Sequence, residues 1–343
     1  MRIMVAFPNT TVGIDYSRLV GELSISDNVQ ALGAHLKFTA VTHARDMLMH
    51  GEGPIPVGSK VGVYTDDGEF LFGGIIVTRT MDTPDKYTYD AYDFGFYLNK
   101  NMISIQFNNV DASTAIKEVL KNQRVKVGYI CDIPTKIRKI YHANIVIDVI
   151  KDILEQAELD TGYKYRVEIR RANQVFIERY NDLEIEMTPV PVNKFDSTSP
   201  GVLGLDVQYV QTMEDLKTRV TVVSGTEKYL THRAEARDEL GEKMYGLLNE
   251  VIRADGKNDS QITNMAINRL QEVAPIGNIV SFKVFGDNRV RSGRIINIPK
   301  SYIKGSLYGR YFVKSCIHTY TNNVYHVMEL EVEYLPSEDE YYA

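Results

Sequence analysis

Three side chains that can bind a metal ion lie close together near residue 320. They are Cys316, His318 and His326, in the stretch CIHTYTNNVYHVMELEVEYL. Cysteine sulfur and histidine nitrogen are the usual ligands of zinc. The stretch also alternates apolar and polar residues, as a β-hairpin does. Two alternatives follow: a metal site, or a hairpin that carries two histidines.

The register of the hairpin separates these alternatives. Facing residues of an antiparallel pair lie on the same side of the sheet. A two-residue turn at Asn322-Asn323 buries both apolar sets together, and asparagine tolerates the positive φ that such a turn requires. In this register His318 faces Val327 and His326 faces Thr319, so the two histidines lie on opposite sides.

A three-residue turn would bring the histidines together. It would also place Val313 and Ile317 on the side that carries the glutamates of the returning strand. We therefore predict a hairpin and no metal site.

Paired carboxylates could instead indicate a glycosidase, which needs two of them across a cleft. The candidates are Glu184 with Glu186, and Glu329 with Glu331 and Glu333. Carboxylates two residues apart on a strand are more typical of a solvated face. No phosphate-binding loop, dinucleotide-binding glycine motif, zinc-protease motif or serine-hydrolase elbow occurs. We predict no catalytic residue and no cofactor.

Composition places the chain among soluble globular proteins. The net charge of −6 argues against a nucleic-acid-binding face, and the short basic clusters 136–139 and 170–171 are typical of solvated surface. Only two cysteines occur, far apart in the sequence, which favours free thiols and a reducing compartment. The sequence shows neither a signal peptide nor a membrane span, so we expect folding in the cytoplasm.

The elements that would carry these residues divide the chain into several parts. Residues 1–108 alternate as strands, with a hairpin at Asp67-Gly68 and a bulge or close backbone contact at Gly73-Gly74. Residues 109–187 form an α+β module, with helices at 110–122 and 143–159. Asp111 or Ser113 can cap the first helix, Asn144 can cap the second and Gly162 can end it.

A linker at 188–202, rich in proline and glycine, ends the module. Residues 203–226 and 276–335 form a second β unit, interrupted by a helical insert at 227–275, and 336–343 form an acidic tail. The insert carries one apolar stripe through Leu240 and Val251 and another through Ile262 and Leu270. The fold class is therefore α+β and mostly β, with two barrel-like units, a small α+β module and a helical insert.

The two β units repeat one pattern. Strand pairs 23–26 with 36–40, and 207–210 with 219–223, each lead to a hairpin and a returning alternating strand. This similarity suggests two copies of one unit, and chance similarity between alternating strands is the alternative.

Three stretches carry a resemblance to a known family. VGSKVGVYTDDGEFLFGGIIV with YTYDAYDFGFYLNKN (57–101) resembles the first tube domain of contractile-tail hub proteins. RSGRIINIPKSYIKGSLYGRYFVKSCIHTYTNNVYHVMELEVEYL (291–335) is similar to the second, as found in the late control protein D group. IPTKIRKIYHANIVIDVIKDILEQAELDTGYKY (133–165) resembles the XkdQ/YqbQ-like hubs of Gram-positive myophages and phage-tail-like particles.

The resemblance implies a baseplate hub of a contractile phage tail or tailocin, without enzymatic activity and with two tube-type β-barrel domains. Three chains would form a ring with six similar units, joining the hexameric tail tube to the threefold central spike. Partners would be the tube protein, the spike, other baseplate proteins and the tape-measure protein, with DNA as passing cargo in a true phage. The hub would be assembled in the bacterial cytoplasm, become part of the particle and be released by lysis, without membrane insertion.

Within this picture, Glu329, Glu331 and Glu333 either face the channel or lie on an ordinary outer surface. Two other functions remain as alternatives. One is a peptidoglycan-cleaving tail enzyme and the other is a monomeric β-barrel binding module.

Overall fold

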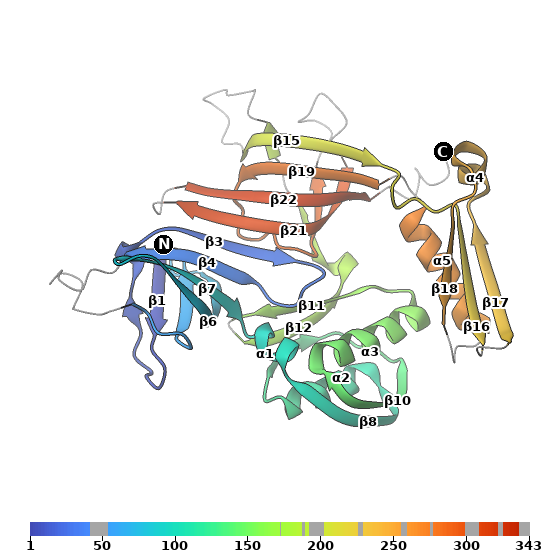
Figure 1. Ribbon diagram of the computed structural model, residues 1–343, viewed down its shortest axis with the longest axis horizontal. Coiled ribbons are helices and arrows are strands. Elements are labelled where there is room, and N and C mark those ends of the chain that lie inside the picture. The colour runs from blue at the N-terminus through green and yellow to red at the C-terminus, as the bar shows by residue number, and fades with distance from the viewer. Residues whose placement is uncertain are drawn as a thin grey trace.

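One long curled sheet forms the body of the protein (Figure 1). The computed structural model describes the chain except residues 42–53, 172, 187–188, 192–201, 226–228, 255–258, 275–276, 299–308, 322–324 and 336–343. Within these described residues the sheet has 14 strands, and three smaller sheets accompany it. The predicted tail 336–343 and most of the predicted linker lie outside the described residues.

The N-terminal half of the long sheet forms the first block. Its strands in spatial order are β3 (Val20–Asn28), β4 (His35–Val41), β7 (Lys86–Asp93), β6 (Phe70–Thr83), β5 (Lys60–Tyr64), β1 (Arg2–Ala6) and β2 (Ile14–Asp15), with a 3₁₀ turn at Ser17–Leu19. Alternate residues of these strands, such as Leu36, Phe38 and Tyr89, are buried together. Gly74 permits a close approach inside the block, because a Cβ there would lie 2.1 Å from the carbonyl oxygen of Tyr92. The predicted close contact is confirmed.

The C-terminal strands form the second block. They are β15 (Val202–Thr212), β19 (Gly277–Phe285), β22 (Tyr325–Leu335), β21 (Gly309–Thr321) and β20 (Ile295–Ile298), with the short strands β13 (Glu184–Glu186) and β14 (Pro189–Pro191). Val280, Val313 and Val332 belong to its core. Strand β14 falls within the predicted linker, yet it pairs in parallel with β15. Strand β21 pairs with β3, so the two blocks share one continuous sheet.

The two blocks follow the same path. The order β3-β4-β7-β6-β5 in the first matches β15-β19-β22-β21-β20 in the second. The irregularities match as well: β6 bulges after Ile76 and β21 after Val313, while β3 bulges after Val20 and β15 after Gly204. The expectation of a mostly β fold built on two similar units is confirmed. The matching of individual strands was partly wrong, because β19, and not residues 219–223, pairs with β15.

The α+β module lies below the second block and beside the first (Figure 1). Its elements are α1 (Gly95–Lys100), β8 (Met102–Asp111), α2 (Ala112–Asn122), β9 (Lys126–Ile130), β10 (Lys136–Ile145), α3 (Val146–Thr161), β11 (Tyr165–Arg170), β12 (Gln174–Arg179) and the 3₁₀ turn Tyr180–Leu183. The predicted helices are confirmed. Asp111 occupies the N-cap of α2, and Gly162 ends α3 with φ of 75°. The predicted N-cap of α3 was wrong by one residue. Ile145 holds that position, and the side-chain oxygen of Asn144 accepts a hydrogen bond from the backbone N–H of His142 instead of capping the helix.

Two predicted boundaries differ from the structure. Strand β8 pairs with β10, so the module begins before residue 108. The segment predicted as a helical insert is instead a second small α+β unit. It contains β16 (Arg219–Gly225), β17 (Leu230–Arg237), α4 (Glu239–Tyr245), β18 (Asn249–Arg253) and α5 (Asp259–Val273). Strand β16 belongs to this unit, which we call the insert, because it pairs with β17 and β18.

The insert buries only one of its two predicted stripes. Ile262 and Ala266 of α5 pack on the three-stranded sheet, as expected for an amphipathic helix. The other stripe does not lie on one helix, because α4 ends at Tyr245 and Val251 lies on β18. Leu240 and Met244 are 71% exposed.

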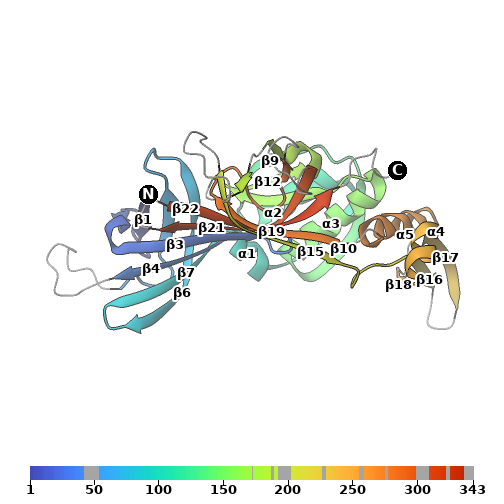
Figure 2. The same cartoon turned by 90° about the horizontal axis from the view of Figure 1, so that it is seen from above.

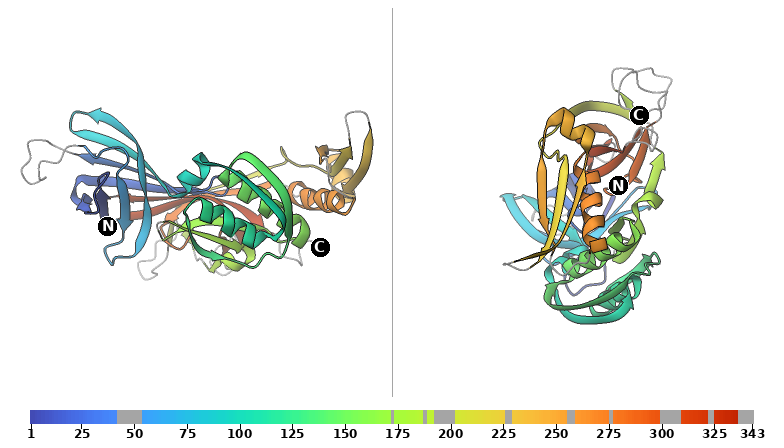
Figure 3. Two further views of the ribbon diagram at one scale, coloured as in Figure 1. Left: turned by 90° about the horizontal axis from the view of Figure 1, so that it is seen from below. Right: turned by 90° about the vertical axis from the view of Figure 1, so that its right-hand side faces the viewer.

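Viewed from above, the long sheet twists strongly between the first block and the insert (Figure 2). The insert projects from the end opposite to the first block, with α5 on the side of the module (Figure 3). An ion pair of 2.6 Å between Lys164 and Glu272 joins the module to α5.

Candidate functional site

The hairpin of β21 and β22 brings the two histidines together. The strands pair His318 with Met328 and Thr321 with Tyr325, which leaves three residues for the turn. The turn itself lies outside the described residues. The predicted two-residue register is therefore wrong by one position. His318 Nδ1 and His326 Nε2 lie 2.8 Å apart on the same side of the sheet.

A bulge explains why the apolar pattern still fits. The sequence pattern argued against this register, because in a regular strand both Val313 and Ile317 would face the glutamates. The bulge between Val313 and Ser315 returns Val313 to the core, where it is fully buried. Ile317 pairs with Glu329 and remains 38% exposed. One extra residue in β21 therefore allows Val313 to be buried in the same register that brings the two histidines together, which a regular strand would not allow.

The histidine cluster is organised as a hydrogen-bonded core. His318 Nε2 lies 2.8 Å from the carbonyl oxygen of Val290 and 3.1 Å from Cys316 Sγ, so both ring nitrogens of His318 have partners. Burial, and then the neighbouring His318, lowers the pKa of His326 to about 4, and burial also lowers the pKa of His318. Burial raises the pKa of the Cys316 thiol. Among the described residues, no three histidine, cysteine or acidic side chains are grouped as a metal site would require.

The three glutamates predicted as possible channel residues share one face of β22, and each has a polar neighbour. Glu329 pairs with Lys283 at 2.6 Å, and Glu333 pairs with Lys314 at 2.8 Å. Ser315 Oγ lies 3.4 Å from Glu331. The negative charge of this face is therefore largely balanced by lysines on neighbouring strands.

The glutamate face continues across the junction into the first block. Because side chains alternate along a strand, the register defines which residues share this face. Glu329 is level with Ile317, Ser26, His35 and Tyr92 across successive strands. The next positions along the strands of the first block carry Ser24, Lys37, Thr39, Thr88 and Asp90. We call this surface, rich in hydroxyls and ion pairs, the polar face.

A charged cluster joins the module to both blocks. Glu168 of β11 is 3% exposed, and its carboxylate contacts Arg291 at 2.6 Å and Arg294 at 2.8 Å. Arg166 donates to Ser292 at 2.7 Å and lies 3.4 Å from Asp27 of β3. These contacts fix the module against residues of both blocks.

Burial by itself would raise the pKa of Glu168. The charges of Arg291, Arg294 and Arg170 outweigh that effect and lower its pKa to about 2. This cluster was not predicted from the sequence, because charged residues on an alternating strand are typical of a solvated face. Arg170, predicted to be solvated, has a side chain only 24% exposed and pairs with Glu168 and Glu178.

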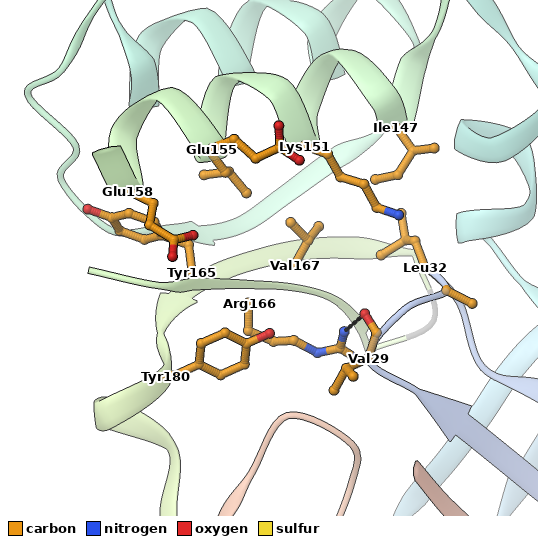
Figure 4. Close-up of a pocket in the computed structure, with 12 residues that line it drawn as sticks. Val29, Leu32, Ile147, Lys151, Glu155, Glu158, Tyr165, Arg166, Val167 and Tyr180 are labelled. Atoms are coloured by element: carbon orange, nitrogen blue, oxygen red, sulfur yellow. Dashed lines mark hydrogen bonds between the residues drawn. The ribbon is translucent and has the colours of Figure 1, made fainter. Parts of the chain in front are cut away.

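A small pocket of about 170 Å³ lies beside this cluster (Figure 4). Lys151 and Glu155 enter it from α3, while Tyr165 and Val167 come from β11. Arg166 crosses its floor to donate to the carbonyl oxygen of Val29 at 3.2 Å. Since Lys151 also donates to the carbonyl oxygen of Gln30, the pocket is part of the contact between the module and the first block.

No helix in the described parts of the chain combines the length and the apolar character needed to cross a membrane.

Solved structures show which class of protein has this fold. The 43 kDa tail protein of prophage MuSo2 from Shewanella oneidensis matches with a TM-score of 0.71 and 11% identity, over 97% of this chain and 98% of that chain. A tail protein from Neisseria meningitidis matches with a TM-score of 0.70 and 11% identity, over 99% and 97%. The E. coli c3393 protein, a component of the type VI secretion system, matches with a TM-score of 0.55 and 9% identity, over 97% and 77%.

The fold is therefore one that phage tail proteins adopt. The chain belongs to the YQBQ-like family, whose model matches residues 23–333. The resemblance predicted from the sequence is confirmed. No relative was found among curated proteins.

Proposed function

We propose that this chain is a structural hub protein of a contractile phage tail or phage-tail-like particle, and that three copies form its ring. The observation that carries this proposal is the internal repeat. Two blocks with the same strand path and the same bulges give three copies six equivalent units. Such a ring presents sixfold similarity to a tail tube while keeping true threefold symmetry for a spike.

The comparisons support the tail setting. The similar proteins from Shewanella and Neisseria are tail proteins, and the E. coli relative is described as similar to the T4 tail proteins gp27 and gp5. Tube protein, central spike, other baseplate proteins and the tape-measure protein are the partners that this role requires.

Light scattering on a sizing column tests the ring. A trimer has a mass of about 117 kDa, three times 39.0 kDa. We expect this mass for the chain alone, or a heavier complex that contains three copies of the chain after addition of purified tube and spike proteins. Electron micrographs should show a ring with a central hole. A chain that stays monomeric with both partners present would contradict the hub and favour a monomeric binding module.

We also propose that the polar face lines the channel of the ring. Its hydroxyls and balanced ion pairs offer few sites to which a passing polymer could adhere, and this applies equally to DNA and to an extended protein. The face would not act mainly by repulsion, since Glu329 and Glu333 are neutralised by Lys283 and Lys314.

Replacing Glu329, Glu331 and Glu333 together by lysine tests this proposal in whole particles. Assembly should remain normal while DNA ejection or killing activity falls, because the reversed charges would attract DNA or acidic segments. The matched control replaces three exposed carboxylates outside the polar face, Glu118, Asp132 and Asp148, by lysine. Equal activity of both variants would show that the face does not contact the cargo.

The role proposed here is not enzymatic. Purified cell walls incubated with the protein should release no soluble fragments, and release above the level of a heat-denatured sample would favour a peptidoglycan-cleaving enzyme.

A further inference from the structure

The three-stranded sheet of the insert has two chemically different faces. Even-numbered residues of its strands, such as Val220 and Val222 of β16, pack against α5. Because side chains alternate along a strand, the odd-numbered residues lie on the opposite face. The pairing of β17, β16 and β18 places three rows there: Arg237, Arg219 and Asn249; Glu235, Thr221 and Val251; and Arg233, Val223 and Arg253. We call this surface the arginine face.

Positive charge is in excess on the arginine face. Arg233 and Arg237 both pair with Glu235, and Arg219 pairs with Glu242 of α4 at 2.8 Å. Even without Arg253, these three arginines outnumber the two carboxylates that they contact. The side chains of Arg233 and Arg237 are 65% and 52% exposed. An acidic segment can therefore reach their guanidinium groups.

Exposed apolar side chains lie beside the arginines. Val251 belongs to the arginine face and is 62% exposed, and Leu247, just before β18, is 58% exposed. Leu240 and Met244 lie one turn apart on α4 and are each 71% exposed. The contact of α4 with Arg219 places this helix at the end of the face where β16 begins. Such a concentration of exposed apolar groups on a soluble protein is typical of a binding surface.

The acidic tail 336–343 leaves the long sheet close to the insert. Strand β22 ends at Leu335, and the register of β19 and β22, extended by two residues, places Leu335 level with Gly277. Gly277 begins β19 and pairs with Thr212, the last residue of β15. The insert is connected to the sheet through the ends of β15 and β19. The tail, which lies outside the described part of the chain, therefore starts beside both connections.

The tail is long enough to reach the arginine face. The two connections lie together, because the N–H of Lys217 donates to the carbonyl oxygen of Val273 at 2.9 Å. Arg219 follows two residues later at the start of β16. The four residues from Val273 to the start of β19 span at most about 15 Å, and the five residues from the end of β22 to Glu340 span about 17 Å when extended.

We propose that the tail of each chain docks on the arginine face of its own insert. The tail has the sequence PSEDEYYA, so Glu338, Asp339 and Glu340 would bind the arginines, and Tyr341 and Tyr342 would cover the exposed apolar side chains. Hydrogen bonds between arginine and carboxylate are among the stronger ones in proteins, and tyrosine offers a large apolar ring. Docking would fix the insert against the second block. This inference does not depend on the proposed ring.

Crosslinking in the full chain tests the docking. Ala343→Cys places a thiol at the end of the tail and keeps its acidic and aromatic residues. Asn249→Cys places the second thiol on the arginine face, whereas the control Asn264→Cys places it on the exposed side of α5. The native Cys131 and Cys316 are both buried. A short bismaleimide should link 249 to 343 within one chain roughly tenfold faster than 264 to 343, because docking raises the local thiol concentration.

Neutralising the tail tests the role of charge without changing the insert. Glu338→Gln, Asp339→Asn and Glu340→Gln together should reduce linking at 249–343 to the rate measured at 264–343. Linking of the unaltered tail should also slow at 1 M salt, where the Debye length falls to about 3 Å. Unfolding of the insert cannot explain a loss in this variant, because every strand of the insert keeps its sequence.

Neutralising the arginines tests the other side of the contact. Arg233→Gln with Arg237→Gln should slow linking at 249–343 to a similar extent. The matched control, Lys126→Gln with Arg138→Gln, removes two exposed positive charges from the module and should leave the rate unchanged.

Three results would overturn the docking. Equal rates at 249–343 and 264–343 would show that the tail does not occupy the arginine face. A rate that is insensitive to the tail charges would exclude recognition by the arginines. Links between copies, seen as dimers or trimers on denaturing gels, would show that the tail binds the insert of a neighbouring copy and not its own. None of these results changes the mass measured by light scattering, so the ring is tested separately.

Discussion

Replacement of Glu168 by alanine offers a direct test of how the module is fixed to the sheet. The change removes a carboxylate that is 3% exposed and contacts Arg291 at 2.6 Å and Arg294 at 2.8 Å. Arg294 has a side chain 9% exposed and would lose its carboxylate partner. An unpaired buried charge is costly, because neither water nor an opposite charge compensates it.

The size of the effect follows from the pKa of Glu168. The surrounding arginines hold it at about 2 in the folded protein, against 4.5 for an unperturbed glutamate. Each pKa unit corresponds to about 1.4 kcal/mol, so the charged carboxylate stabilises the folded state by roughly 3 kcal/mol. Removing one partner of a buried pair typically costs about 3–5 kcal/mol. We expect the free energy of unfolding to fall by about 3–5 kcal/mol.

Urea unfolding at pH 7, followed by circular dichroism, measures this loss. Glu178→Ala is the matched control, because Glu178 is 22% exposed and contacts the same Arg170, and it should cost about 1 kcal/mol or less. Because the pKa of Glu168 is lower in the folded than in the unfolded protein, its charged carboxylate stabilises the fold at pH values above the unfolded pKa. This stabilisation is lost as the pH falls through the folded pKa. The wild type should therefore lose stability between about pH 4.5 and pH 2, and Glu168→Ala should lose less there. Equal losses for the two variants at pH 7 would refute the reasoning.

Three further predictions concern single positions. Gly162→Ala should lower the free energy of unfolding by about 1 kcal/mol, since φ is 75° at the end of α3, and no change in the urea midpoint would contradict this. Gly74→Ala should cost about 1–3 kcal/mol because its Cβ would meet the Tyr92 carbonyl, whereas Gly21→Ala, with open space around its Cβ, should leave the melting temperature nearly unchanged. The unfolded state binds more protons than the folded state between the pKa of about 4 for folded His326 and its unperturbed value of 6.5, so stability should fall on acidification through that window. His326→Phe should reduce the difference in melting temperature between pH 7.5 and pH 5, and an unchanged difference would exclude His326 as its source.

Local patterns were sufficient to predict most elements. The apolar period of 3.6 residues defined α2 and α3, and Gly162 marked the end of α3 correctly because few other residues adopt a positive φ. Alternation and the Asp67-Gly68 turn predicted the hairpin of β5 and β6. These features depend on neighbours in the sequence, which a single sequence displays.

Features that depend on distant partners were missed. The bulge at Lys314 cannot be distinguished from regular alternation without the neighbouring strands, and it allows Val313 to be buried in the register that places His318 and His326 on the same side. Strand β16 alternates like its neighbours, and only pairing with β17 and β18 assigns it to the insert. The burial of Glu168 depends on arginines that lie far along the chain.

The pairing of β21 with β3 also has a consequence for how the protein is made. These strands are separated by most of the chain, so during synthesis β3 leaves the ribosome long before its partner exists. The edge of β3 therefore stays unpaired until β21 has been synthesised. During that time the β21 strand of a neighbouring nascent chain could pair with it in place of the β21 strand of the same chain. Contacts between distant parts of a sequence also form slowly. Completion of the sheet therefore depends on a kinetic competition between pairing with β21 of the same chain and pairing with β21 of another chain. Slower translation or more crowded polysomes would increase the share of chains with exchanged strands.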